Sequence, residues 1–275
     1  MSNFRRRLIL ALKTPSHGWV EIMRVTTIGT TTVNLPKIYK QLGFFVVGGG
    51  GSGHGDFSGG GNSGSGGNGG CVNHFIVPFN MSSCSVTVGR GGITGQSRKN
   101  SNNGSASYVV YDGVTYQSNG GYGGSNTPGK ANTKQKNSGI GGFARWGGYQ
   151  NLAMYNWCAN HTALEVYPGT TTTYGGKGEN GLPNPFDEAD TNLYGAGGGG
   201  SQNAYLPTGY VGPAISGGVR GGGSGGYGNN NTATNRGQDG SFYGAGGGGG
   251  SFSSNHSYSQ GGAGYQGIII IYGKK

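Results

Sequence analysis

Strand-like runs of β-branched and aromatic residues alternate with glycine tracts along most of the chain. From Val25 the sequence VTTIGTTTVNLPKIYKQLGFFVV, broken by glycine and proline, predicts two strands at about 25–33 and 42–47. Asp112-Gly113 between two such runs is a typical hairpin turn. Further strands are predicted at 72–79, 84–88, 106–111, 114–118 and 267–272.

Glycine tracts fill the spaces between these runs, at 48–70, 119–124, 139–148, 175–178, 195–200, 217–228, 244–250 and 261–267. No segment has a convincing helical period with caps, and 151–166 is the one weak helix candidate. The last strand must return to be buried, so we expect it to close the small sheet that residues 25–118 begin. The predicted fold is mainly β and irregular, with a small β-sheet or sandwich, a bundle of polyglycine II helices and little or no α-helix.

Composition supports an ordered fold. Glycine accounts for 66 of 275 residues, yet the chain also has 17 Tyr, 10 Phe and 3 Trp and only 10% charged residues. Disordered chains usually have few aromatic residues and high charge, so disorder fits poorly. Glycine does not recur at every third position, which excludes collagen.

Oligoglycine can form an extended left-handed helix with three residues per turn and its N–H and C=O groups pointing outward. Without Cβ atoms, several such helices can pack side by side and bond to one another through the backbone. We therefore expect the tracts to form a parallel and antiparallel array across residues 119–266. Aromatic rings should cover its margins, among them Tyr122, Tyr194, Tyr227 and Tyr243.

Residues 1–24 contain one glycine and differ from the glycine-rich domain predicted over 25–275. Their apolar run, Leu8 to Leu12, is too short for a signal peptide, and no run approaches a membrane span. We interpret 1–24 as an attachment segment that docks on a protein partner. Its candidate contact residues are Phe4, Arg5, Arg6, Arg7, Leu8, Ile9 and Leu10.

Charge and cysteine patterns suggest little chemistry. The net charge of +10 is scattered, which favours a solubility role over nucleic-acid binding, and we expect no nucleic-acid partner. Two Cys-x-x-His pairs, Cys71 with His74 and Cys158 with His161, could together supply four zinc ligands, but coincidence is the preferred reading and no metal is predicted.

Phosphate-binding motifs fail on inspection, so no cofactor is predicted. Residues 124–131 have the spacing of a phosphate loop but end in Ala131, where Ser or Thr is needed. The R-G-G triplets at Arg90 and Arg220 are expected by chance at this glycine content. The acidic cluster Asp187, Glu188 and Asp190 could serve glycoside cleavage, but a solvated turn is the simpler reading and we predict no enzyme.

Glycine-poor insertions between the tracts are the candidate binding loops, and 143–169 is the longest and most aromatic of them. Amphipathic rings beside Asn, Ser and Asp are typical of contact surfaces. The same rings could instead cap the array or pack between subunits. The candidate ligand-binding residues are Trp146, Tyr149, Tyr155, Trp157, Asp187, Tyr205, Tyr210, His256 and Tyr258.

In order along residues 25–272, the motifs GFFVVGGGG, CSVTVGRGG, VVYDGVTY, two copies of YGAGGGG and a terminal GGAGYQGIIIIY resemble the glycine-rich domain of tailed-phage fibre and adhesin proteins. The opening MSNFRRRLIL is similar to that of many proteins of Bacteroides and of crAss-like phages. The resemblance implies sandwiched polyglycine helices that present variable loops to a host surface.

On this resemblance we expect a virion structural protein, assembled in the host bacterial cytoplasm, with no membrane insertion. Its expected partners are other virion proteins through the N-terminus, further copies of itself, for example in a trimer, and a host-surface glycan or outer-membrane protein. A head-fibre, capsid-decoration or adaptor role is the alternative. A depolymerase is the third candidate.

Overall fold

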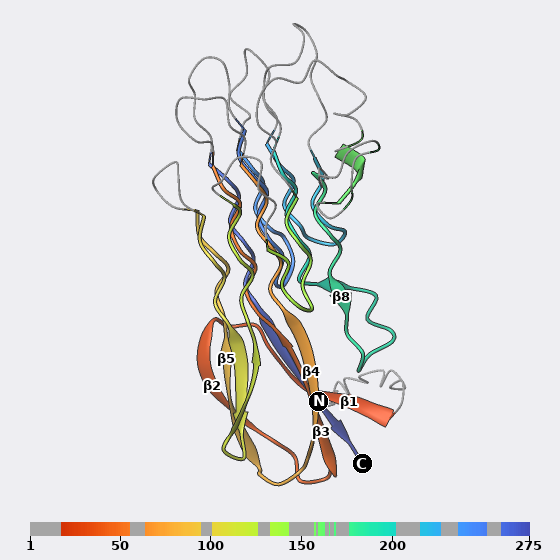
Figure 1. Ribbon diagram of the computed structural model, residues 1–275. Helices are drawn as coiled ribbons and strands as arrows, with labels where there is room; N and C mark the ends of the chain where they lie inside the picture. The colour runs from red at the N-terminus through yellow and green to blue at the C-terminus, as the bar shows by residue number, and fades with distance from the viewer. Residues whose placement is uncertain are drawn as a thin grey trace, which may run out of the picture.

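Among the described residues, eight of the ten strands form two four-stranded sheets at one end of the molecule (Figure 1). The computed structural model describes residues 18–55, 64–94, 101–125, 133–142, 157, 159–162, 165, 168, 176–201, 215–226, 236–251 and 260–275. The first sheet has the order β1 (Trp19–Val25), β10 (Ile268–Lys274), β3 (Gln41–Val47), β4 (Val72–Pro78). The second has the order β2 (Gly29–Asn34), β5 (Ser83–Val88), β6 (Ser107–Tyr111), β7 (Val114–Ser118).

Both sheets are antiparallel, and the last strand closes the first of them as the sequence predicts. β10 lies between β1 and β3. Its Ile270 is opposite Arg24 of β1 on one side and Phe45 of β3 on the other. β6 and β7 form the hairpin expected at Asp112-Gly113. The predicted fold class, mainly β with polyglycine helices and little α-helix, is confirmed. α-Helical backbone in the described residues is found at 157, 159 and 160.

The hydrophobic core has two layers because β3 and β10 are buried on both faces. Alternate residues of β10, such as Ile269 and Ile271, point between the two sheets, where they join the inward-facing side chains of β5 and β6. Ile268 and Ile270 point to the outer face of the first sheet and join a second cluster. Burial on both faces explains why the end of the chain is a continuous apolar run, whereas the strands of the second sheet alternate.

The first sheet extends further toward the N-terminus than the sequence analysis predicted. β1 begins at Trp19, inside the segment 1–24 that the sequence analysis set apart, and the single strand expected at 25–33 is the end of β1 followed by β2. β1 is an edge strand with charged residues at Glu21 and Arg24, so its pattern resembles that of an irregular segment. Its register also shifts between Glu21 and Met23.

Two further strands, β8 (Leu182–Pro183) and β9 (Leu193–Tyr194), pair to carry a loop over the outer face of the first sheet. In this loop Phe186 meets Trp19 edge-on, with ring centroids 5.0 Å apart, and stacks on Tyr272 at 5.1 Å. Tyr194 meets Phe45 edge-on at 4.9 Å. Gly43 of β3 leaves room for the Phe186 ring, because a Cβ at this position would lie 2.7 Å from that ring.

The glycine tracts continue beyond the sheets as an array of extended chains whose backbone bonding has a period of three. Along tract 48–54 every third N–H donates to the same neighbour, over 2.8–3.0 Å. One neighbour is 65–71, the next is 102–105 and the third is 262–265. A three-residue turn without internal hydrogen bonds is the signature of the polyglycine II helix.

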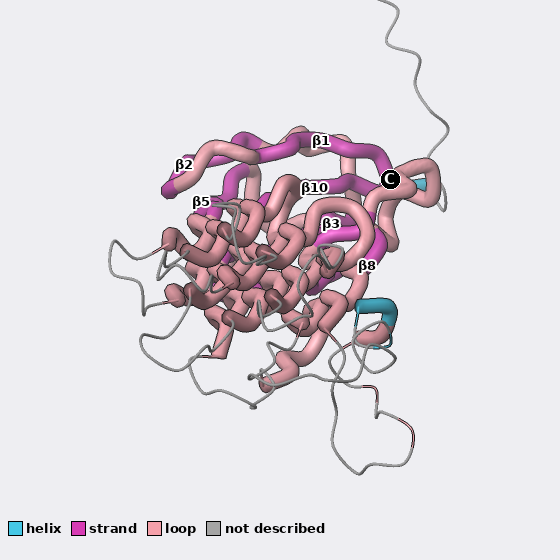
Figure 2. The backbone as a smooth tube through the Cα atoms, turned by 90° about the horizontal axis from the view of Figure 1, so that it is seen from above, coloured by secondary structure: helices cyan, strands magenta, loops and turns pink. Residues whose placement is uncertain are grey.

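Carbonyl groups complete the array. Those of tract 48–54 accept N–H groups from 121–124, from residue 92 and from 247–250, again at intervals of three. The tract therefore has three neighbours through its donors and three through its acceptors, some parallel to it and some antiparallel. Tract 245–250 is surrounded in the same way, by 51–54, 64–70, 196–199, 223–226, 238 and 262–265. The tracts form the parallel and antiparallel array that the sequence predicts, but the predicted bounds of 119–266 are too narrow, because 48–54, 65–71, 92 and 102–105 also belong to it. Figure 2 shows the tracts packed side by side when viewed from above.

The two YGAGGGG copies adopt the same local structure and pack against each other. Gly195 and Gly244 have φ values of 72° and 74°, which glycine adopts without strain, and each lies at the turn where a tract begins. The Gly195 N–H donates to the Tyr243 carbonyl at 3.1 Å, and the Gly246 N–H donates to Ala196 at 2.8 Å. Each copy of the YGAGGGG motif therefore marks the point at which the chain turns and begins a glycine tract.

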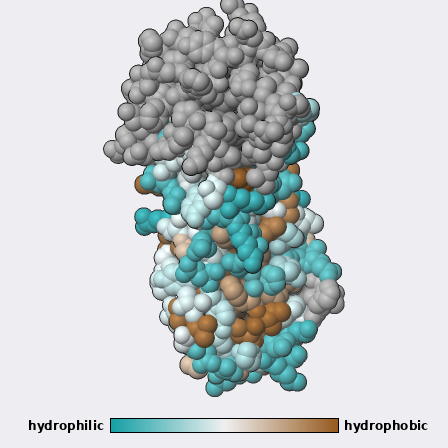
Figure 3. Space-filling model, in the orientation of Figure 1, coloured by the Kyte–Doolittle hydropathy of each residue, from teal (hydrophilic) through white to brown (hydrophobic). Residues whose placement is uncertain are grey.

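Figure 3 shows apolar patches over the sandwich and a mainly hydrophilic or neutral surface over the described part of the array. Exposed large side chains on the strands and turns of the sandwich include Ile38, Ile76, Met81 and Val114. Within the described part of the chain, no helix has the length and apolar character that crossing a membrane requires.

Candidate functional site

The outer end of the array is the first candidate site, because the chain leaves the described tracts there repeatedly. Residues 54, 64, 201 and 250 are linked by backbone hydrogen bonds, so these ends lie at one level of the array (Figure 1). The segments that start and finish at this end include 56–63, 202–214 and 252–259. We call this surface the loop-bearing end.

The opposite end of the molecule holds the chain termini of the described part. β10 runs away from the array, and Trp19 pairs with Lys274 at its far end. The sandwich thus separates the start of β1 and the C-terminus from the loop-bearing end.

Most of the candidate binding residues lie outside the described residues. This applies to Trp146, Tyr149, Tyr155, Tyr205, Tyr210, His256 and Tyr258, and to the attachment residues Phe4, Arg5, Arg6, Arg7, Leu8, Ile9 and Leu10. Trp157 and Asp187 are described, and they lie in different parts of the fold.

Trp157 stacks on His161, with ring centroids 3.9 Å apart and planes 8° from parallel. The pair is tied to the array, because the Lys177 N–H donates to the His161 carbonyl at 2.9 Å. Next to it the Glu165 carboxylate accepts the N–H and the hydroxyl of Thr162, and the Thr162 N–H lowers the pKa of Glu165 below its usual range. A stacked aromatic pair is thus fixed to a tract.

Asp187 lies in the loop that covers the first sheet, between Phe186 and Tyr194. Its carboxylate accepts the Ala189 N–H at 3.0 Å, and its carbonyl accepts the Asp190 N–H at 3.0 Å, which closes a local turn. The structure therefore does not bring Asp187 together with Trp157. The Asp190 carboxylate accepts the Tyr194 hydroxyl at 2.6 Å, and burial raises the pKa of Tyr194.

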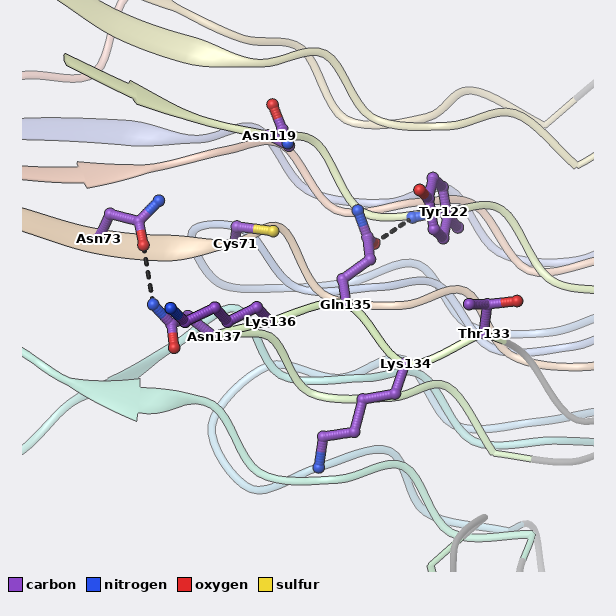
Figure 4. Close-up of a pocket in the computed structure, with 9 residues that line it drawn as sticks. All are labelled: Cys71, Asn73, Asn119, Tyr122, Thr133, Lys134, Gln135, Lys136 and Asn137. Atoms are coloured by element: carbon purple, nitrogen blue, oxygen red, sulfur yellow. Dashed lines mark hydrogen bonds between the residues drawn. The ribbon is translucent and has the colours of Figure 1, made fainter.

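A second candidate site, which the sequence analysis missed, is a pocket of about 390 Å³ on the side of the array (Figure 4). We call it the side pocket. Three segments remote in sequence form it: the start of β4, the chain after β7, and residues 133–137. Its lining residues are Cys71, Asn73, Asn119, Tyr122, Thr133, Lys134, Gln135, Lys136 and Asn137.

Hydrogen bonds hold the walls of the side pocket in place. The Asn137 Nδ2 donates to Asn73 Oδ1 at 2.8 Å, and the Tyr122 N–H donates to Gln135 Oε1 at 2.9 Å, as Figure 4 shows. Cys71 is buried, and this burial raises the pKa of its thiol. No local sequence signal could have identified the pocket, because the array alone brings these segments together.

Metal ligation gains no geometric support. Among the described residues, no three His, Cys, Asp or Glu side chains are grouped so that they could hold a metal ion. Cys71 lines the side pocket, whereas the His74 ring lies against Phe186, with centroids 5.9 Å apart. Cys158 lies outside the described residues.

Comparison with known proteins identifies the family but no individual relative, since no curated protein matches the chain. The family model described as a glycine-rich domain matches residues 25–274, which include β2 to β10 and every described tract. The match therefore covers both the strands and the glycine tracts into which they lead. The chain belongs to the glycine-rich domain family.

Proposed function

We propose that the protein is a bacteriophage virion structural component, a tail-fibre or receptor-binding protein without enzymatic activity that displays loops to the host surface. The observation that carries this proposal is the polarity of the molecule. Segments such as 56–63, 202–214 and 252–259 start and finish at the loop-bearing end, and β1 starts at the opposite end. An anchored protein that recognises a surface needs this separation.

The array favours recognition by loops because it is a platform on which loop sequences can vary. Its stability resides in backbone hydrogen bonds between tracts, so it depends little on the residues that connect them. The motif resemblance to phage fibre and adhesin proteins supports the same function. In this proposal, residues 1–17 lead from the sandwich to another virion protein.

The expected partners follow from this arrangement. The N-terminal segment binds virion proteins, copies of the chain assemble with one another, and the loops bind a host-surface glycan or outer-membrane protein. The Trp157–His161 stack, held by Lys177 beside a tract, is the described aromatic feature best suited to such contact.

Binding of the full chain to a panel of Bacteroides strains tests the proposal. Labelled protein is titrated onto cells, and bound label is measured by flow cytometry. Replacing Trp146 and Trp157 with Ala should weaken binding by about 1–3 kcal/mol each, the usual scale for an aromatic anchor, with thermal stability nearly unchanged. Ile38→Ala, at an exposed position of the sandwich, is the control and should bind as the parent does.

Two outcomes would contradict this proposal. Absence of binding to every strain, with the protein found in the virion by electron microscopy, would favour the head-fibre, decoration or adaptor role. Release of reducing sugar from capsular polysaccharide would favour a depolymerase.

A further inference from the structure

The side pocket has the size and definition of a small-molecule site. Its volume of about 390 Å³ falls within the range of about 300–1,000 Å³ typical of such sites. Its walls are positioned by the Asn73–Asn137 and Tyr122–Gln135 hydrogen bonds, and Asn68 Nδ2 fixes the Thr133 carbonyl at 2.8 Å. A ligand would therefore meet groups that are already ordered.

Several polar groups around the pocket have no protein partner within the described part of the chain. They include the Lys136 ammonium, the Tyr122 hydroxyl, Asn119 Nδ2 and Asn137 Oδ1. The Asn119 Oδ1 is occupied by Gln117 at 2.7 Å, and Lys134 pairs with Glu179 at 3.2 Å. The pocket thus offers both free donors and a free acceptor to a ligand.

The chemistry of this lining fits a sugar better than a peptide or a phosphate. None of the nine lining side chains is aliphatic, so the apolar anchors of a peptide would find no matching pocket. Side-chain amides donate and accept, which matches hydroxyl groups, whereas a phosphate dianion needs donors alone. Tyr122 is 44% exposed, and its ring can cover the apolar face of a pyranose.

The charge of the pocket lining indicates which class of sugar it would bind. Lys136 is exposed and unpaired among the described residues, and Glu179, the carboxylate beside Lys134, is already paired with that lysine. The side pocket therefore has an uncompensated positive charge, which favours a sugar carboxylate.

We propose that the side pocket binds one acidic sugar unit, with the carboxylate at Lys136, hydroxyl groups at Asn119 and Asn137, and the ring face against Tyr122. This site is separate from the loop-bearing end. It rests on the pocket and does not depend on the virion assignment.

Titration of the full chain with sodium glucuronate, followed by NMR of side-chain and backbone amides, tests the proposal. Saturable shifts should be confined to residues of the side pocket, such as Asn73, Asn119 and Asn137. Glucose should bind roughly tenfold more weakly, because it lacks the charge-assisted contact. Sodium acetate, which has the carboxylate without the ring, should give no saturable shift.

Two variants and two matched controls identify the contacts. Lys136→Gln should weaken glucuronate binding about tenfold and bring it to the level of glucose. Tyr122→Leu should weaken both sugars. Lys37→Gln and Tyr265→Leu remove a charge and an exposed ring elsewhere and should leave binding unchanged.

Asn137→Gly provides an independent test, because Asn137 has φ 58° and glycine adopts that backbone without strain. It should weaken binding while the melting temperature stays close to that of the parent. Shifts outside the pocket, equal binding of glucose or acetate, or Lys136→Gln and Tyr122→Leu variants that bind as the parent does would each overturn the proposal. A failure to bind host cells would leave this site unaffected and would count against the loop-bearing end alone.

Discussion

At the residue scale, a hydrogen atom in place of a Cβ makes the array possible. A Cβ at Gly51 would lie 2.1 Å from the Tyr122 carbonyl oxygen, and one at Gly248 would lie 2.0 Å from that of Ser224. The atoms in the way belong to the backbone of neighbouring tracts, which cannot rotate aside as a flexible side chain can. Side chains occur in the tracts at a few positions, including Ala196 and Ala245.

Gly248→Ala should therefore lower the free energy of unfolding by about 3 kcal/mol, the upper part of the range for overpacking, because two bonded tracts must separate. Ser105→Ala, in a tract position that already has a Cβ, is the control and should change stability by less than about 0.5 kcal/mol. Denaturant unfolding of both variants checks this. Equal stability of the Gly248 variant and the parent would show that the tracts are not in direct contact.

Burial of Cys84 in the sandwich predicts a loss of stability at alkaline pH. Burial raises the pKa of this thiol from 9.0 to about 11. The unfolded chain loses the proton near pH 9 and the folded chain holds it, so stability present below pH 9 decreases as pH rises. The loss attributable to Cys84 between pH 8 and 10 should be about 1 kcal/mol.

Unfolding by denaturant at pH 8, 9 and 10 measures this loss, and Cys84→Val, which lacks the ionisable thiol, is the control. The difference between parent and variant should change with pH in the stated direction. A constant difference would mean that the Cys84 thiol is not protected from ionisation in the folded protein.

At the element scale, the strands and tracts could be predicted because their signals are local. Ile268 to Ile271 have the continuous apolar pattern of a buried strand, and the glycine runs can satisfy their backbone groups by bonding to one another without side chains. β1 was missed because an edge strand with Glu21 and Arg24 has no clear alternation, and those two side chains pair with each other at 2.8 Å. β8 and β9 are too short for any periodicity.

The candidate sites could be predicted only in part, for a physical reason. The sequence shows where glycine-poor insertions begin, and so it indicates the loop-bearing end. The side pocket depends on Cys71, Asn119 and Gln135 meeting across three tracts, which is a property of lateral packing. Such packing leaves no pattern within any one segment.

β1 also sets the length of chain that the sandwich needs. Removing residues 1–17 should leave the melting temperature unchanged, because β1 and the contact of Trp19 with Phe186 are retained. Removing residues 1–25 uncovers the edge of β10 and deletes the Trp19 side chain, and should cost about 3 kcal/mol or more. Thermal unfolding of the two truncated chains compares them. If the chain without residues 1–25 were as stable as the parent, β1 would contribute no stability.

At the scale of the whole molecule, the sandwich and the array share their chain segments, since β3 continues into tract 48–55 and tract 260–267 leads into β10. Neither part can unfold without disturbing the other, so one cooperative transition is expected. The array has no side-chain core, so its protection must come from the hydrogen bonds between tracts.

Hydrogen exchange measures this cooperativity directly. The amides of Gly51 and Gly247, which donate to neighbouring tracts, should exchange as slowly as those of β3, although they belong to no α-helix or β-sheet. The exposed amide of Gly113 in the hairpin turn is the internal reference for fast exchange. Comparable fast exchange at all three glycines would show that the array opens independently of the sandwich.

The three-residue period of the tracts also constrains how such a protein can change its length. One glycine inserted into tract 245–250 would rotate all later residues by a third of a turn and redirect each N–H to a different neighbour. Three inserted glycines would restore every bond and advance the chain by about 9 Å, since each residue rises about 3.1 Å. Related proteins with this fold should therefore gain or lose tract residues in multiples of three, whereas the connections at the loop-bearing end can change in length by any number of residues.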